Sequence, residues 1–388
     1  MSVTAAQGFR AAGVAAGLKS SGNPDVAVVV NDGPSRTAAA VFTSNRCKAN
    51  PVIWSQEAIK TGRASAVVIN SGGANCYTGA EGFATTHRTA ELAAERLGVG
   101  AIDVQVCSTG LIGLLNDRDA LLGGVGAAID ELSADGGSAA ATAIMTTDTV
   151  AKEAVAHAED HDGEGWIVGG MAKGAGMLAP ALATMLVTIT TDADVDAATA
   201  DAALRAATAR TFDRLDSDGC QSTNDTVLLL ASGSSGVTPD PQAFTAAVTA
   251  VCQDLALQLL ADAEGADHEI TIDVVNAATE ADALEVGRSI ARSNLFKCAI
   301  FGKDPNWGRI LASVGTTQAA FDPADLDVAL NGVWVCRNSG PAESPDRVSL
   351  EERAVSVTVD LKAGAETATV WTNDLTHAYV HENSAYST

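Results

Sequence analysis

The sequence lacks the features that would assign it to a membrane or to an exported compartment. No stretch of its 388 residues approaches the ~18–20 uninterrupted apolar residues that span a bilayer, although 47% of the residues are hydrophobic. Residues 1–20 contain no continuous apolar segment of the ~7–15 residues that a signal peptide requires. We therefore expect a cytoplasmic protein with no membrane partner.

The cysteines form no Cys-x-x-Cys pair, and their number is odd. The seven are widely spaced along the chain, at Cys47, Cys76, Cys107, Cys220, Cys252, Cys298 and Cys336. This pattern argues against a disulfide framework and against a zinc site, and it suits thiols in a reducing cytoplasm. The sequence therefore predicts no metal site.

Basic residues are scarce as well. The chain has 24 lysines and arginines against 48 aspartates and glutamates, which gives a formal net charge of −24. A strongly acidic surface repels the phosphate backbone of nucleic acids, so we expect no nucleic-acid partner. The length is sufficient for two or three structural units with a substantial core.

Hydrophobic periodicity predicts both helices and strands. Asp240 is a good N-cap, Pro241 suits the first helical turn, and apolar residues recur at helical spacing until Gly265. Apolar and polar residues then alternate over 270–274, as on a strand. Thr279, with an aspartate three residues later, forms a capping box for another helix.

Other segments extend this mixture along the whole chain. Further strands are predicted at 26–30, 66–70, 187–191, 226–231, 326–330 and 355–361, and further helices at 85–97 and 197–212. Residues 158–165 are rich in Asp, Glu, His and Gly and are predicted to form an exposed hairpin loop. The pattern predicts an α/β or α+β architecture in which helices cover layered sheets.

The glycine-rich centre of the chain, Gly169–Thr191, allows two interpretations. The string Gly174-Ala-Gly-Met-Leu-Ala179 matches the dinucleotide-binding fingerprint, which requires a helix directly after the glycines. Pro180 would interrupt that helix, and Val187–Thr191 is β-branched and strand-like. A nucleotide-binding protein therefore stays an alternative that the local sequence disfavours.

The same segment can instead be a tight loop that delivers Thr184 to the start of a strand. A threonine hydroxyl beside a strained peptide can attack the preceding carbonyl, here that of Ala183, and water then hydrolyses the ester. The product is an N-terminal threonine whose own amine, with a pKa near ~8, can act as general base. By composition alone, Thr184 would be an ordinary strand threonine.

A family resemblance supports the second interpretation. The string Lys173-Gly-Ala-Gly-Met-Leu-Ala-Pro-Ala-Leu-Ala-Thr-Met-Leu186 resembles the self-cleavage segment of the bifunctional ornithine acetyltransferase / N-acetylglutamate synthase family, the ArgJ family. Similar blocks follow the family's order from the first fifth of the chain to its end: Asn70-Ser-Gly-Gly-Ala-Asn75, Cys107-Ser-Thr-Gly-Leu-Ile112, Ala143-Ile-Met-Thr-Thr-Asp148, Asp218-Gly219, Ser222-Thr-Asn-Asp-Thr226, Asp304-Pro-Asn-Trp-Gly-Arg309 and Glu382-Asn-Ser-Ala-Tyr386.

The resemblance implies a particular fold and a divided chain. The expected fold is a layered sandwich of two stacked β-sheets covered by helices, shared with self-processing, N-terminal-nucleophile-like aminopeptidases. Cleavage between Ala183 and Thr184 would give an α chain of residues 1–183 and a β chain of residues 184–388. The expected assembly is α2β2.

The resemblance also implies the residues of the site. Thr109 and Gly110 would form the oxyanion hole, in which a hydroxyl and a backbone N–H stabilise the developing negative charge. Lys173 would favour the neutral amine of Thr184 and hold a substrate carboxylate, and Glu264 would bind the cationic amine of ornithine. The substrate-binding residues that it implies are Thr146, Thr147, Lys173, Thr184, Glu264, Asn383 and Thr388.

The implied reaction transfers acetyl from N2-acetyl-L-ornithine to L-glutamate through an acetyl-Thr184 intermediate, giving ornithine and N-acetylglutamate in arginine biosynthesis. It requires no metal and no bound cofactor, and acetyl-CoA could serve only as an alternative donor. A different enzyme on the same scaffold, an amide hydrolase such as an aminopeptidase, would let water resolve the acyl-enzyme instead of glutamate.

Overall fold

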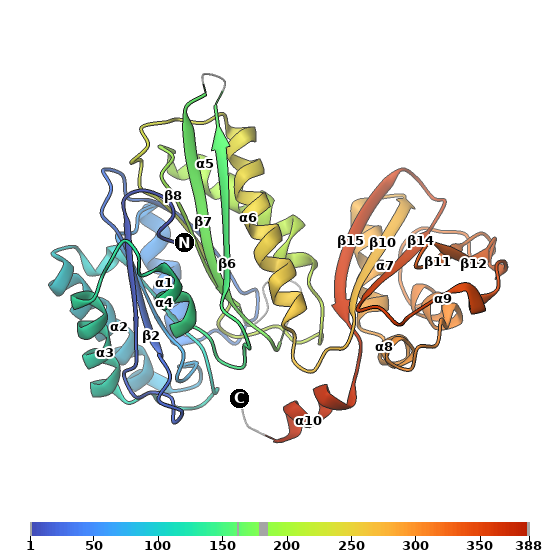
Figure 1. Ribbon diagram of the computed structural model, residues 1–388, viewed down its shortest axis with the longest axis horizontal. Helices are drawn as coiled ribbons and strands as arrows, with labels where there is room; N and C mark the ends of the chain where they lie inside the picture. Colours follow the sequence, from blue (N-terminus) through green and yellow to red (C-terminus); the bar gives the residue numbers. More distant parts are fainter. Residues whose placement is uncertain (1, 161–162, 178–184, 386–388) are drawn as a thin grey trace.

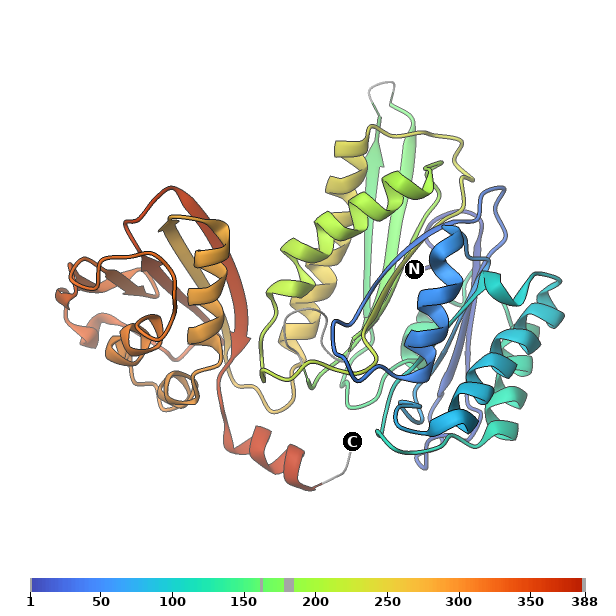
Figure 2. The ribbon, with the colours of Figure 1, turned by 180° about the vertical axis from the view of Figure 1, so that it is seen from behind.

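The computed structural model describes residues 2–160, 163–177 and 185–385. The chain forms a larger body, which ends with helix α6 (Pro241–Ala261), and a smaller C-terminal lobe (Figure 1). Helix α10 (His377–Ala385) leaves the smaller lobe and turns back toward the body, as both views show (Figure 2).

The first sheet of the body has four strands in the order β1-β2-β4-β5. Their bounds are β1 (Phe9–Val14), β2 (Val26–Asn31), β4 (Ala66–Asn70) and β5 (Val104–Ser108). Only the β4–β5 pair is parallel among these neighbours. The strands predicted at 26–30 and 66–70 are confirmed as β2 and β4.

The second sheet has five strands in the order β3-β9-β8-β7-β6. Their bounds are β3 (Thr37–Phe42), β6 (Lys152–Glu159), β7 (Gly165–Lys173), β8 (Leu186–Thr191) and β9 (Thr226–Ala231). Strands β8 and β9 are parallel, and the other neighbours are antiparallel. The predicted hairpin loop joins β6 to β7, although Ala158 and Glu159 still belong to β6.

The two sheets pack face to face, which confirms the predicted layered sandwich. Alternate residues of β2 explain the arrangement: Ala27 and Val29 enter the core between the sheets, whereas Val26, Val28 and Val30 enter the core beneath the outer helices. This alternation is the period-2 pattern of a strand that is buried on both faces.

Helices cover both outer faces of the sandwich. The first sheet is covered by α2 (Gly79–Leu97) and α3 (Arg118–Asp130), and the second by α5 (Ala197–Arg210) and α6. Two shorter helices, α1 (Asn50–Ala58) and α4 (Gly137–Ala143), pack beside β5 and β1. Helix α2 begins six residues before the predicted start at Thr85.

The C-terminal lobe contains a third sheet, which the sequence pattern did not separate from the others. Its six strands lie in the order β13-β12-β11-β14-β10-β15. Their bounds are β10 (Glu269–Ala277), β11 (Asp327–Leu330), β12 (Val333–Arg337), β13 (Gly340–Pro341), β14 (Ala354–Asp360) and β15 (Glu366–Asn373). Helices α7 (Glu280–Ala291), α8 (Asn294–Phe301) and α9 (Trp307–Val314) complete the lobe.

The predicted helix caps are present. The Asp240 carboxylate accepts hydrogen bonds from the backbone N–H groups of Gln242 and Ala243 at the start of α6, and the Thr279 hydroxyl accepts from that of Asp282 at the start of α7. Helix α6 ends at Ala261, earlier than the predicted Gly265. It is long and apolar enough to cross a membrane, but half of that stretch is buried inside the body.

Candidate active site

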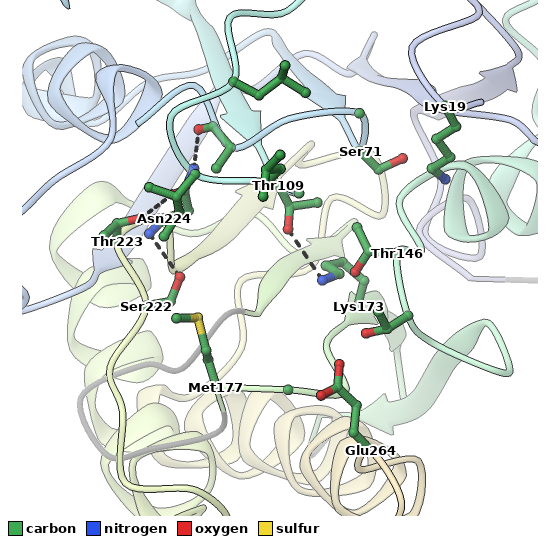
Figure 3. Close-up of a pocket in the computed structure, with 18 of the residues that line it drawn as sticks. Lys19, Ser71, Thr109, Thr146, Lys173, Met177, Ser222, Thr223, Asn224 and Glu264 are labelled. Carbon is green, nitrogen blue, oxygen red and sulfur yellow. Dashed lines mark hydrogen bonds between the residues drawn. The ribbon is translucent and has the colours of Figure 1, made fainter. Parts of the chain in front are cut away.

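A cavity of about 620 Å³ gathers most of the predicted site residues (Figure 3). Its walls come from segments far apart in sequence on both sides of the predicted cleavage point. The predicted residues that line it are Thr109, Gly110, Thr146, Thr147, Lys173, Glu264 and Asn383. These seven site residues were predicted from the family resemblance alone, and the structure places them in one pocket.

Thr109 and Gly110 lie directly after β5, where the chain turns across the end of the first sheet. Gly110 has a φ of 123°, and a Cβ there would lie 2.9 Å from the backbone nitrogen of Gly73, so only glycine fits. The Thr109 hydroxyl is buried and accepts a hydrogen bond of 3.3 Å from Nζ of Lys173. Because the hydroxyl accepts from Lys173, its own proton stays free to be donated into the pocket.

Lys173, at the end of β7, belongs to a buried group of charges. Asp148 lies 3.9 Å from Nζ of Lys173 and accepts a hydrogen bond of 2.7 Å from Nζ of Lys152. Lys152 in turn donates to Asp262 at 2.6 Å. Burial lowers the pKa of Lys173, and the negative charge of Asp148 opposes this effect. The Asp148 carboxylate therefore supports a positive charge on Lys173.

Asp148 also fixes the backbone around the pocket. Its carboxylate accepts from the backbone N–H of Thr146 at 2.9 Å and from that of Gly174 at 2.6 Å. Burial acts to raise the pKa of this carboxyl, but the charges of Lys173 and Lys152 prevail and lower the pKa to about 2. The ionised carboxylate thus joins the loop that carries Thr146 to the end of β7.

This depressed pKa predicts a pH-dependent stability. With an ordinary pKa of 3.8 and a folded pKa of about 2, ionised Asp148 contributes roughly 2 kcal/mol, in full above about pH 5 and progressively lost as the pH falls toward 2. Asp148→Asn should therefore be less stable than the wild type at neutral pH, and the difference in free energy of unfolding should shrink below pH 5. Urea unfolding at several pH values measures this. The exposed Asp119→Asn is the control, and an Asp148→Asn difference that does not change with pH would contradict the assignment.

Glu264 reaches the pocket because Gly176 and Gly265 have no side chain and let neighbouring groups approach their backbone closely. A Cβ on Gly176 would lie 2.7 Å from the Glu264 carboxylate, and one on Gly265 (φ 61°) would lie 2.2 Å from the backbone nitrogen of Tyr379. Helix α10 can therefore pack against this turn, where Nδ2 of Asn383 donates to Glu264 at 3.0 Å. Asn383, one of the two predicted site residues of the C-terminal segment, therefore lies at the site.

Three predicted residues, Ala183, Thr184 and Thr388, lie outside the described residues. The next residue after Thr184 is described, however: the backbone N–H of Met185 donates to Oδ1 of the buried Asp225 at 3.0 Å. Strand β8 then begins at Leu186, at a position where the dinucleotide fingerprint would require a helix to continue.

Sequence reasoning missed several residues of the pocket. Lys19 and Asp218 line it. Asn224, two residues before β9, donates to the backbone oxygens of Ala74 and Ser108 at 2.6 and 2.7 Å, and so joins this segment to the end of β5 and to the loop after β4. Burial raises the pKa of Asp218 to about 6. Asp218 and Asn224 belong to sequence blocks that resemble the family, whereas no motif in the sequence marked Lys19 as a site residue.

No cluster of three or more His, Cys, Asp or Glu side chains suited to a metal ion occurs in the described part of the chain. A helix-covered pair of stacked sheets, with a polar pocket lined by residues at the ends of β5 and β7, is the architecture of the N-terminal-nucleophile class, as predicted.

Comparison with known proteins gives the family. Residues 10–388 match the ArgJ family, so the chain belongs to it. It is 63% identical over 387 residues to the arginine biosynthesis bifunctional protein ArgJ of Streptomyces coelicolor and 61% identical over 388 residues to that of Thermobifida fusca, with 100% of both chains covered in each case. The predicted acetyltransferase of arginine biosynthesis is confirmed at the level of the family.

One solved relative is the crystal structure of ornithine acetyltransferase complexed with ornithine from Mycobacterium tuberculosis. It is 54% identical, the match covers 48% of this chain and 96% of that chain, and the TM-score is 0.44.

Proposed function

We propose that this chain transfers the acetyl group of N2-acetyl-L-ornithine to L-glutamate, with Thr184 as nucleophile. The observation that carries the proposal is the convergence of Thr109, Gly110, Lys173 and Glu264 on one pocket. These residues supply two oxyanion donors, one cation and one anion, which is the set that a zwitterionic acetylated amino acid requires.

The nucleophile would be generated by cleavage between Ala183 and Thr184, which gives an α chain of residues 1–183 and a β chain of residues 184–388. The freed amine of Thr184 accepts the proton of its own hydroxyl, and Oγ attacks the acetyl carbonyl. The bond between Asp225 and the N–H of Met185 supports this arrangement, because it anchors the backbone of the next residue.

Thr109 and Gly110 then stabilise the oxyanion. The Thr109 hydroxyl and the Gly110 N–H donate to it while the bond between the acetyl carbon and the ornithine nitrogen breaks. The ammonium of Thr184 returns its proton to that nitrogen, ornithine leaves, and an acetyl ester remains on Thr184. The amine of glutamate attacks the ester by the same route in reverse, and N-acetylglutamate is released.

The pocket charges suit the donor. Glu264, held by Asn383, would bind the side-chain ammonium of ornithine, and Lys173 would bind its carboxylate. Thr146, Thr147 and Thr388 would complete the substrate contacts. The mechanism uses no metal and no bound cofactor, and acetyl-CoA as an alternative donor would deliver the same acetyl group to Thr184. We further propose an α2β2 assembly located in the cytoplasm.

A single assay separates this function from an amide hydrolase on the same scaffold. Incubation with N2-acetylornithine alone should release at most about one equivalent of ornithine per site, and addition of glutamate should start continuous release with matching formation of N-acetylglutamate. Sustained release of ornithine and acetate at the same rate without glutamate would favour the hydrolase and overturn the transferase.

A further inference from the structure

Lys19 is a second cation of the pocket, and the proposed mechanism does not use it. It lies in the loop between β1 and β2 and lines the same cavity as Lys173. Nζ of Lys19 donates to the backbone oxygens of Pro24 at 2.8 Å and Met145 at 2.7 Å. An ammonium group has three protons, so one proton is left for a ligand.

The loop that carries Lys19 is built to hold it in place. The buried carboxylate of Asp25 accepts from the backbone N–H groups of Ala16 at 2.6 Å, Leu18 at 2.6 Å and Lys19 at 3.0 Å. Since these bonds fix the loop before any ligand arrives, the Lys19 side chain needs little further ordering on binding.

The charges of the pocket are arranged along its length. Figure 3 shows Lys19 and Glu264 at opposite ends of the labelled side chains, with Thr146 and Lys173 between them. Burial lowers the pKa of Lys19, and the nearby charge of Lys173 lowers it further, whereas Asp25 and Asp148 raise it. A bound carboxylate at this end would relieve the repulsion between the two ammonium groups.

The two substrates of the proposed reaction differ in their need for cations. The donor has one carboxylate and one side-chain ammonium, which Lys173 and Glu264 can satisfy. The acceptor, glutamate, has two carboxylates and no side-chain ammonium, so its second carboxylate would be repelled by Glu264 and Asp218. We propose that Lys19 binds the side-chain carboxylate of glutamate and so selects the acceptor. This inference rests on the proposed function.

The test compares glutamate with glutamine, which has nearly the same shape but carries an uncharged amide in place of the side-chain carboxylate. In Lys19→Met the value of kcat/KM for glutamate should fall ~10–100-fold, the range of a lost charge-assisted hydrogen bond. The value for glutamine and the rate of acetyl-enzyme formation from N2-acetylornithine should stay within about twofold. Lys19→Arg should keep most of the preference for glutamate, because the charge is retained.

Two further variants keep the test decisive. Lys19→Gln retains N–H donors for the loop while it removes the charge, so it replaces Lys19→Met if that protein does not fold. Lys60→Met removes an exposed lysine that pairs with Glu57, and it should leave both acceptors unaffected.

The outcomes are separable. If removal of the Lys19 charge slows transfer to glutamate and glutamine equally, or slows acetyl-enzyme formation as much as transfer, Lys19 does not select the acceptor. If the wild type itself releases no ornithine from N2-acetylornithine, the proposed function is overturned, and with it the inference about Lys19.

Discussion

Thr184→Ala is expected to leave the chain as one polypeptide of 39.3 kDa with no acetyl transfer. Alanine has no hydroxyl to attack the carbonyl of Ala183, and without cleavage no amine is freed to act as base. Denaturing mass spectrometry measures the first effect directly, because the wild type should give two fragments, the second beginning at Thr184. The transfer assay measures the second, and the loss should reach the detection limit.

Thr188→Val is the matched control. Thr188 is another buried threonine of the same segment, in β8, and its hydroxyl has no hydrogen-bond partner among residues 2–160, 163–177 and 185–385. Its replacement by the isosteric valine should leave cleavage and transfer intact. Cleavage of Thr184→Ala at the wild-type position, or transfer by that variant, would overturn the proposed mechanism.

Thr109→Val is expected to reduce kcat by ~10²–10³, the usual effect of removing one oxyanion-hole donor. Valine keeps the shape of threonine, so the buried side chain still fits, and only the hydroxyl that faces Lys173 is lost. Because the lost interaction is made mainly in the transition state, KM for N2-acetylornithine should change little. Steady-state kinetics over a range of donor concentrations separates the two parameters.

The effect of Thr109→Val on self-cleavage must be measured separately from its effect on acetyl transfer, because an oxyanion also forms when the carbonyl of Ala183 is attacked. Protein that has already been cleaved should therefore be used for the kinetics, after its two fragments have been confirmed by mass spectrometry. Thr109→Ser restores the hydroxyl and should recover most of the activity. A Thr109→Val enzyme with wild-type kcat would exclude Thr109 from the oxyanion hole.

The sequence predicted those elements whose local signals agree with the final packing. The helix capped by Asp240 and the alternating strand at 355–361 have clear periodicity, and the structure confirms them as α6 and β14. The strands at 66–70 and 226–231 have weaker signals, and the structure confirms them as well. The separate C-terminal lobe was not predicted, although four of its elements (β10, α7, β11 and β14) were. Periodicity identifies strands, but it does not say which strands pair, because pairing depends on contacts between residues far apart in the chain.

The candidate site was also predicted only in part. The resemblance named Thr109, Lys173, Glu264 and Asn383, and the structure places all four around one pocket, whereas their roles stay predictions. The network beneath them was not predicted. Lys152 and Asp262 are 110 residues apart, and no local pattern indicates that this aspartate, rather than one of many others in an acidic chain, is the partner.

The strand order of the second sheet has a consequence for how the divided protein holds together. After cleavage, strands β8 and β9 would belong to the β chain, yet they lie between β7 and β3, which would belong to the α chain. Each piece alone would therefore expose the edges of unpaired strands, which are prone to aggregate. The intact precursor must therefore assemble the sheet before cleavage, and cleavage leaves the completed fold unchanged. If the two chains are unfolded and then mixed, we expect them to regain the native structure poorly.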